Sequence, residues 1–419
     1  MSNLKLALKA SARWNNSVLL NSVLYPLCVV TQRIFSGKCL SAIQLKNQLD
    51  YGTLYTNTES MICPLNSGTR EESRTKAMQI DSSEILKQAR RLYNALPIRE
   101  IKTGHSGSLV FEMEAGSRPC ILRATEADER KFAHAVFEIK WTSYLSGKMA
   151  GIVKPLPSVN GSLFEVIEAD GKQLLLTFQE KAAGKHVNPE NPEEFNESLF
   201  FRLGEVMGQM HRLTMDYPGN IYDPEFRWNG PHFWWKNILI EDEKVRHGER
   251  RFLKELEELP MGRENFGIVH FDIHTDNFLA DGPKLTIIDF EACQFNWYAA
   301  DIASALFFLV QKGAGPLSVT DKERTQFAEN CLISYLKGYR ETNEISPWWI
   351  GKIDLFMRYQ MVDEYIAAQF SKPQNGSSEE LQRWRQYRDW HRDRIVRNEP
   401  YAAIDYEKVL ESVYFGTVK

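Results

Sequence analysis

The chain has 419 residues, of which 43% are hydrophobic and 25% charged, and its formal net charge is −4. This length predicts two or three folded regions with sizeable cores, and the composition is that of an ordinary globular protein. A slightly acidic chain has no overall basic surface, which argues against a nucleic-acid partner. The six cysteines show no Cys-x-x-Cys spacing, so we expect neither a zinc site nor a disulfide framework, but a reducing, cytoplasmic location.

Residues 1–77 differ in composition from the rest of the chain. No acidic residue occurs before Asp50, whereas Lys, Arg, Ser and Asn are frequent. Such a segment resembles an organellar transit peptide, but we favour a leader that is disordered or dispensable, with Met78 as the effective start. The apolar run from Val18 to Val30 is short and is interrupted by Asn21, so no membrane span is expected.

A nucleotide-binding lobe is predicted for residues 78–181. An amphipathic helix over 82–96 is followed by a hairpin with strands over 98–101 and 109–113. Ser106 and Gly107 lie at the tip of this hairpin, where backbone N–H groups could cover phosphates. A helix is expected to begin near Ala127. Further runs over 119–124, 153–157, 163–167 and 174–178 make six candidate strands for a sheet that we expect to be antiparallel and five-stranded.

Residues 182–419 are predicted to be mainly helical. His211 has helical spacing from Met207 and Met210, which favours a buried core histidine over a catalytic one. An aromatic cluster over 216–240 fits either a second core or the wall of a substrate site. Helices are predicted over 195–213, from the run 295–303 through Val310, and over 321–340, 347–368 and 377–397. The last of these helices mixes Arg with Asp and Glu, which is typical of a solvated face.

The stretch 267–291 carries the residues with the clearest chemistry. A short apolar run leads to Asp272, a turn reaches Asn277, and a second strand ends at Asp289. Two short strands joined by a tight turn at 281–283 would bring these three side chains together. One carboxylate as base and two oxygen ligands for Mg²⁺ are what metal-assisted phosphoryl transfer requires. We therefore expect Asp272 to be the catalytic base, and Asn277 and Asp289 to be the metal ligands.

A metal-dependent hydrolase is an alternative interpretation of the same stretch. Four residues alternate and would share one face of a strand, where they could ligate Zn²⁺: His270, Asp272, His274 and Asp276. This alternative gives no role to Asn277 or Asp289, so the phosphotransferase hypothesis is preferred.

The pattern His270-x-Asp272-x-x-x-x-Asn277, followed by an Ile-Asp-Phe sequence at Asp289, resembles the catalytic core of aminoglycoside phosphotransferase-like (APH/choline kinase-like) kinases. Within that family, the run 295–303 is most similar to homoserine kinases and bacterial stress-response kinases. The resemblance extends over roughly residues 80–400. It implies an α+β, protein kinase-like fold with a small antiparallel-sheet N-lobe and a large, mainly helical C-lobe, and ATP and Mg²⁺ between them.

The resemblance also implies roles for residues outside this stretch. Arg123 stands where protein kinases have a phosphate-binding Lys. Glu138 resembles the glutamate that pairs with that cation, although Glu126 or Glu129 could pair with it instead. Gln179 and Lys181, in the segment that joins the lobes, would lie at the adenine. His270 and Asp301 would support the catalytic loop.

The reaction implied by the resemblance is transfer of the γ-phosphate of ATP to a hydroxyl of a small molecule. The acceptor classes considered are homoserine, amino alcohols, aminoglycosides and sugars. A Ser/Thr protein kinase of the stress-response type is the alternative, which a groove for an extended peptide would favour. A nucleotide-binding scaffold without turnover is disfavoured because Asp272, Asn277 and Asp289 are all present.

Overall fold

The computed structural model describes residues 82–101, 108–126, 128–220, 222–230, 240–373 and 376–416. The described residues all belong to the unit Met78–Lys419. The predicted leader, the start at Met78 and the hairpin tip with Ser106 and Gly107 lie outside the described residues, so these expectations stay predictions.

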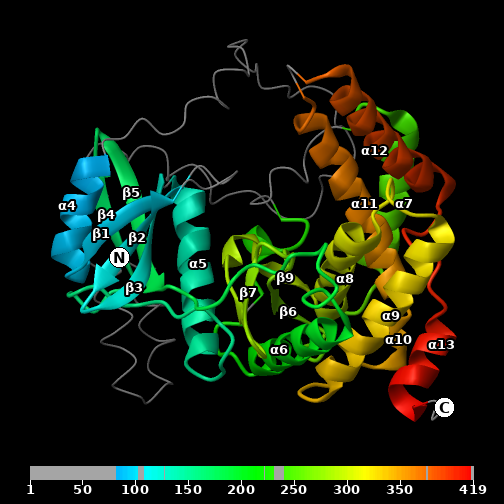
Figure 1. The fold of residues 1–419 in the computed structure, drawn as a ribbon, viewed down its shortest axis with the longest axis horizontal. Coiled ribbons are helices and arrows are strands. Elements are labelled where there is room, and N and C mark those ends of the chain that lie inside the picture. The colour runs from blue at the N-terminus through cyan, green and yellow to red at the C-terminus, as the bar shows by residue number, and fades with distance from the viewer. Residues whose placement is uncertain are drawn as a thin grey trace, which may run out of the picture. The chain divides into compact units, whose positions relative to one another are not determined.

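A five-stranded antiparallel sheet forms the N-terminal part of this unit (Figure 1). Its spatial order is β1-β2-β3-β5-β4, so only β4 departs from the order of the chain. The turn from β4 to β5 is a two-residue turn in which Asp170 and Gly171 both have positive φ, the geometry that joins twisted hairpin strands. The strands are β1 (Leu96–Ile101), β2 (Leu109–Ala115), β3 (Arg118–Glu126), β4 (Phe164–Ala169) and β5 (Lys172–Glu180).

The predicted strand over 153–157 is wrong. This segment makes isolated bridges only, from Ile152 to Ile287 and from Pro155 to Gln179. Proline has no N–H to donate to a strand ladder, and the segment contains two prolines. The sheet takes its five strands from the other five predicted runs.

Two helices accompany the sheet, α4 (Ser82–Tyr93) and α5 (Glu129–Ser146). α4 buries Ile85, Ala89 and Leu92 in a core that it shares with apolar residues of the sheet. This periodicity of three and four residues is the one from which the helix was predicted. Asp128 caps α5 by accepting a hydrogen bond from the backbone N–H of Lys131.

The C-terminal part is mainly helical and has its own, larger core. The predicted helix over 347–368 is interrupted after Ile350, where Gly351 caps a short helix and a longer one begins at Ile353. No helix of the described residues is long and apolar enough to cross a membrane. The α-helices are α6 (Glu197–Met215), α7 (Glu243–Glu257), α8 (Tyr298–Ala314), α9 (Asp321–Arg340), α10 (Pro347–Ile350), α11 (Ile353–Phe370), α12 (Ser378–Arg397) and α13 (Tyr406–Leu410).

Short helical turns and two small sheets lie among these helices. 3-10 turns occur at Pro224–Phe226 and Phe290–Ala292, and a π-helical turn occurs at Glu411–Phe415. The two-stranded sheets, which frame the candidate site, pair β6 (Phe266–Val269) with β9 (Gln294–Trp297), and β7 (Phe278–Asp281) with β8 (Lys284–Ile287).

The helices α6 and α9 pack very closely. A Cβ at Gly204 or Gly208 of α6 would collide with backbone atoms of Tyr335 or Tyr339 in α9, so only glycine permits this approach. The contact places His211, one turn further along α6, next to the Tyr339 hydroxyl. The packing of these two helices thus helps to position His211, whose ring is also hydrogen-bonded to Asp301 of α8.

Candidate active site

The loop from His270 to Asn277, between β6 and β7, is anchored by a buried carboxylate of α8. Asp301 is fully buried and accepts hydrogen bonds from the backbone N–H groups of His270 (3.1 Å) and Phe271 (2.7 Å). It also accepts one from His211 Nε2 at 2.9 Å. The expected location of His211 in the core is therefore confirmed, and its ring additionally orients the carboxylate that holds the loop.

Phe271 lies in a left-handed conformation, with φ of +64°. A non-glycine residue there is strained by on the order of 1–3 kcal/mol. Besides the bond to Asp301, Ser304 Oγ donates to the Phe271 carbonyl at 3.0 Å. Both hydrogen bonds come from α8, and they fix the direction in which the chain enters Asp272.

His270 is buried and bridges the two ends of the site. Its Nε2 donates to the carbonyl of Ile288 at 3.1 Å, and its Nδ1 accepts from the backbone N–H of Asp272 at 3.3 Å. Ile288 directly precedes Asp289. These contacts fit the structural role predicted for His270.

The structure brings the three residues of the predicted catalytic set together. Asn277 Nδ2 donates to the Asp272 carbonyl at 2.8 Å and to its carboxylate Oδ2 at 2.9 Å. The backbone N–H of Ile288 donates to the Asn277 carbonyl at 2.9 Å, which places Asp289 at the adjacent position. Asp289 itself has a φ of +59°, and its side chain is 47% exposed.

Arg123 of β3 lies among three carboxylates. Its guanidinium is 3.7 Å from Glu138 of α5 and 3.7 Å from Asp289, and it forms its shortest contact with Glu291. The predicted Arg123–Glu138 pair is present. The proposed partner Glu126 pairs with Lys172 instead, so that alternative is wrong.

The electrostatics of this group are dominated by burial. Burial acts to lower the pKa of Arg123, but Glu291, Glu138 and Asp289 together raise it above its usual range. Burial raises the pKa of Glu138 to about 7, against the opposing effect of Arg123. Three carboxylates and one arginine leave a negative balance, so this group suits a ligand that arrives with cations.

Sequence reasoning did not assign a role to Glu291. It stands where the protein-kinase Asp-Phe-Gly sequence has its Gly. Because residues 290–292 form a 3-10 turn after Asp289, Glu291 is carried back toward Arg123. The signal that could have indicated this role is the position of the Glu291 carboxylate, two residues after the predicted metal ligand Asp289.

The predicted adenine-segment residues make other contacts. Gln179 lies within β5, where its register partner is Ile121. The Lys181 ammonium is 2.5 Å from Glu112, and its backbone N–H donates to the Pro119 carbonyl at 3.1 Å. The side chain of Lys181 is thus committed to Glu112, and its role toward ATP stays a prediction.

The conformation of the loop contradicts the premise of the hydrolase alternative. β6 ends at Val269, so the alternating polar residues after it do not lie on a strand. His270 is turned to the Ile288 carbonyl, whereas His274 lies 3.6 Å from Asp272 Oδ2 and 3.4 Å from Asp276 Oδ2. Within the described ranges, no group of three or more His, Cys, Asp or Glu could hold a metal ion.

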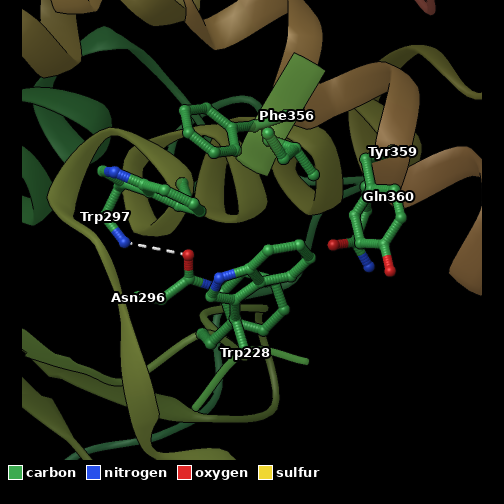
Figure 2. A pocket seen from close by; sticks show the side chains of 9 residues that line it. Trp228, Asn296, Trp297, Phe356, Tyr359 and Gln360 are labelled. Atoms are coloured by element: carbon green, nitrogen blue, oxygen red, sulfur yellow. Dashed lines mark hydrogen bonds between the residues drawn. The ribbon is translucent and has the colours of Figure 1, made fainter. Parts of the chain in front are cut away.

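A small cavity is lined by Phe271 of the loop, by Trp228 and by residues of β9 and α11. Figure 2 shows Trp228, Trp297 and Phe356 around the Asn296 amide, whose oxygen accepts the Trp297 backbone N–H at 2.8 Å. The volume of this cavity is about 10 Å³, comparable to one water molecule. The cavity is therefore too small for an acceptor molecule. Trp228 is therefore part of a core, which agrees with one of the two interpretations of the aromatic cluster. The part of that cluster over 231–239 lies outside the described residues.

Comparisons with known proteins agree on one family. The family model described as "Phosphotransferase enzyme family" (APH) matches residues 97–345, more than half of the chain. Amicoumacin kinase of Bacillus subtilis (strain 168) is 32% identical over 255 residues, which cover 59% of this chain and 73% of that protein.

Solved structures share the fold. Amicoumacin kinase hAmiN, in complex with AMP-PNP, Ca²⁺ and Ami, superposes with a TM-score of 0.67 at 24% identity, covering 78% of this chain and 97% of that one. A microcompartment-associated aminopropanol kinase gives a TM-score of 0.56 at 18% identity, covering 75% and 98% of the two chains. Both likenesses confirm the predicted α+β, protein kinase-like architecture; the finer placement beside homoserine and stress-response kinases stays a prediction.

The family model covers more than half of this chain, and amicoumacin kinase is 32% identical over 73% of its own length. The chain therefore belongs to the phosphotransferase enzyme family, the kinases that transfer phosphate from ATP to an alcohol group of a small molecule.

Proposed function

We propose that Asp272 is the catalytic base of this phosphotransferase, and that Asn277 and Asp289 hold Mg²⁺ together with ATP. The observation that carries the proposal is the junction of the three residues, in which Asn277 bonds to Asp272 through its side chain and to Ile288 through its carbonyl. Such a set supplies the proton acceptor and the oxygen ligands that phosphoryl transfer needs.

The donor chemistry fits Mg²⁺. The Asn277 amide nitrogen is used twice, toward Asp272, while no described residue donates a hydrogen bond to its amide oxygen. The Asp289 carboxylate is half-exposed, and its nearest cation is Arg123 at 3.7 Å. An amide and a carboxylate oxygen with open positions are hard ligands, and Mg²⁺ completes such a shell with water and phosphate oxygens.

The role of each side chain follows from its position. Bound ATP with Mg²⁺ would supply the phosphoryl group and neutralise part of its charge. Asp272 would accept the proton of the acceptor hydroxyl at its carboxylate, which Asn277 holds in orientation. Arg123 would turn from its carboxylate partners to the phosphate oxygens, for which its planar guanidinium is suited.

The proposed acceptor is a small molecule. This rests on the similarity of the chain to amicoumacin kinase. A screen of ATP consumption with Mg²⁺ tests the proposal, with amino alcohols, homoserine, aminoglycosides, sugars and casein as acceptors. We expect ADP formation that depends on at least one small molecule. Phosphate incorporation into casein alone would contradict the proposal and favour a protein kinase.

We also propose that the two lobes meet at residues 181 and 182, directly after β5. The last strand of the five-stranded sheet ends at Glu180, and residues 184 and 185 already contact β7, where Lys185 and Ala280 exchange backbone hydrogen bonds. The proposed N-lobe is 78–181 and the proposed C-lobe 182–419.

A cytoplasmic location is proposed from the cysteines. Cys120, Cys293 and Cys331 are buried and unpaired. Burial raises the pKa of the Cys331 thiol well above its usual range, which keeps it protonated and unreactive. Free structural thiols fit a reducing compartment.

A further inference from the structure

His274 lies in the middle of the loop from His270 to Asn277 and is bonded to both of its functional ends. Its backbone N–H donates to the Asp272 carbonyl at 3.2 Å, and its carbonyl accepts the backbone N–H of Asn277 at 2.9 Å. The residue is therefore tied to the proposed base and to the residue whose amide bonds to that base. These two hydrogen bonds fix the point from which the His274 side chain starts.

Two further contacts fix the orientation of the His274 ring. Nδ1 accepts the backbone N–H of Asp276 at 3.2 Å, whereas the carboxylate of Asp276 lies farther from it, at 3.4 Å. The ring also packs edge-on against Phe308 of α8, with centroids 5.7 Å apart and an interplanar angle of 69°. A ring nitrogen that accepts an N–H carries no proton, so in the neutral ring the proton lies on Nε2. The loop thus favours the tautomer in which Nε2 is a donor.

Nε2 lies next to the carboxylate of the proposed base. It is 3.6 Å from Asp272 Oδ2, the oxygen that also accepts the Asn277 amide at 2.9 Å. Among the residues that the structure describes, none donates a hydrogen bond to the other oxygen, Oδ1, and the Asp272 side chain is 38% exposed. A separation of 3.6 Å is longer than a hydrogen bond, but such contacts in active sites often shorten when the substrates bind.

We propose that His274 is a positioning residue for phosphoryl transfer. Its Nε2–H and the Asn277 amide together bind Oδ2 of Asp272, which leaves Oδ1 for the hydroxyl proton of the acceptor. In the reaction, the acceptor oxygen bonds to the γ-phosphorus while the bond from that phosphorus to the bridging oxygen of ADP breaks, and the hydroxyl proton passes to Oδ1. His274 takes up no proton in this step. The inference rests on the proposed function, because it takes Asp272 as the base.

The physical reason is the freedom of a partly exposed carboxylate. Rotation about its last side-chain bond has a broad, two-fold preference, so one hydrogen bond restrains it only in part. A second donor on the same oxygen keeps Oδ1 of Asp272 at one position. A misplacement of about 1 Å at a reacting group can lower the rate about 100-fold. The contribution of His274 should therefore appear in kcat and not in substrate binding.

Three replacements of His274 separate its contacts. His274→Asn retains an oxygen that can accept the Asp276 N–H but has no donor at the position of Nε2. His274→Gln reaches that position with its amide N–H, and His274→Phe keeps only the packing against Phe308. We expect kcat to fall by about 10- to 100-fold in the Asn and Phe variants, the size of a hydrogen bond to a charged group. The Gln variant should lose no more than about fivefold.

The measurement is steady-state kinetics with ATP, Mg²⁺ and an acceptor. Homoserine, ethanolamine and kanamycin are tried in turn, and the first that supports ADP formation by the wild type is used. KM for ATP and for the acceptor should stay within about threefold of wild type. Calorimetry with Mg²⁺ and a non-hydrolysable ATP analogue should give an unchanged Kd, which shows that the variants are folded. His247→Asn, at an exposed histidine of α7, is the control and should keep the wild-type kcat.

The Asp272→Asn background gives an independent readout. If His274 acts through the Asp272 carboxylate, the addition of His274→Asn to this background should change the residual kcat by less than about twofold, because the group to be positioned is already lost. A general effect on the loop would instead lower the residual kcat by the same factor as in the wild type, and would overturn the inference.

The other outcomes separate the inference from the proposed function. Wild-type kcat in His274→Asn or His274→Phe, or an equal loss in His274→Gln and His274→Asn, would contradict the positioning role and leave the phosphotransferase proposal intact. A raised KM for the acceptor with unchanged kcat would show that His274 binds substrate, and would also overturn it. Absence of transfer to every acceptor in the wider screen would contradict the proposed function and the inference together.

Discussion

The carboxylate of Asp301 accepts the backbone N–H of Phe271 at 2.7 Å, one residue before the proposed base Asp272. The same carboxylate accepts from His270 and from His211, so three donors from two parts of the chain end on one buried side chain. A fully buried carboxylate is stable only when its oxygens are satisfied. The position of the base is therefore coupled to the packing of α6 and α8.

Replacement of Asp301 by Ala should destabilise the protein by about 3 kcal/mol or more. It leaves two backbone N–H groups and the His211 ring without an acceptor in the core. Urea unfolding monitored by tryptophan fluorescence measures the effect. Asp389→Ala, which removes a half-exposed carboxylate of α12, is the matched control and should stay within about 0.5 kcal/mol of wild type. An equal, small change in both variants would show that Asp301 does not anchor the loop.

Replacement of Arg123 by Ala should raise the KM for ATP at least about tenfold. The guanidinium lies between Glu138, Asp289 and Glu291, and its removal takes away both the phosphate contact and the counter-charge of three carboxylates. Steady-state kinetics with varied ATP provide the measurement. Arg99→Ala on β1, which removes an exposed arginine paired with Glu112, is the control. A KM for ATP that is equal in the two variants would remove Arg123 from the nucleotide site.

Mg²⁺ and the nucleotide should bind cooperatively. If Asn277 and Asp289 supply only part of the oxygen shell, Mg²⁺ binds weakly alone and more tightly with a non-hydrolysable ATP analogue. Asp289→Ala should abolish this coupling in calorimetry, whereas His274→Ala should weaken it far less. Tight, stoichiometric binding of Zn²⁺ without nucleotide, lost in His274→Ala, would instead support the hydrolase alternative.

Protonation of His391 should contribute to acid unfolding. Its Nδ1–H donates to the Tyr387 carbonyl, and the ring is buried near Arg324 and Arg394. Burial lowers the pKa of His391 to about 4, below the usual value of 6.5. The unfolded chain then binds more protons between pH 6.5 and 4, so the contribution of a neutral His391 is complete above pH 6.5 and is lost as the pH falls toward 4.

The matching experiment compares the unfolding free energies of wild type and His391→Gln between pH 4 and 7. As the pH falls from 7 to 4, the unfolding free energy of the wild type should decrease relative to that of His391→Gln by on the order of 2–3 kcal/mol. His247→Gln, at an exposed histidine of α7, is the control. A difference that does not vary with pH would mean that the ring is not held neutral by burial.

The geometry of the loop from His270 to Asn277 was predictable because its signal is local. Asp272, Asn277 and Asp289 lie within 20 residues, and the strands between them have turn and β-branched residues that fix their pairing. The same holds for the five-stranded sheet, except that the run 153–157 was read as a strand although its prolines prevent a ladder. The other five predicted runs form the five strands of the sheet.

Residues that act across the fold were not predictable in the same way. Glu364 meets Gln311 and Tyr387 only after three helices have packed, and no spacing in the sequence indicates that contact. Glu291 reaches Arg123 because of a single 3-10 turn. The break at Gly351 depends on a turn that helical periodicity does not reveal. Long-range charge pairing is set by tertiary packing, which a one-dimensional pattern does not contain.

The most direct test of the account follows the γ-phosphate of ATP by ³¹P NMR, with Mg²⁺ and an acceptor selected in the screen, for wild type and Asp272→Asn. Asn preserves the size of the side chain but cannot take up the hydroxyl proton. The account predicts a new phosphate-ester signal with wild type and a rate lower by several orders of magnitude with the folded variant, because positioning and proton acceptance both depend on this carboxylate. A phosphate ester formed at nearly the wild-type rate by Asp272→Asn would contradict the assignment of Asp272 as the base.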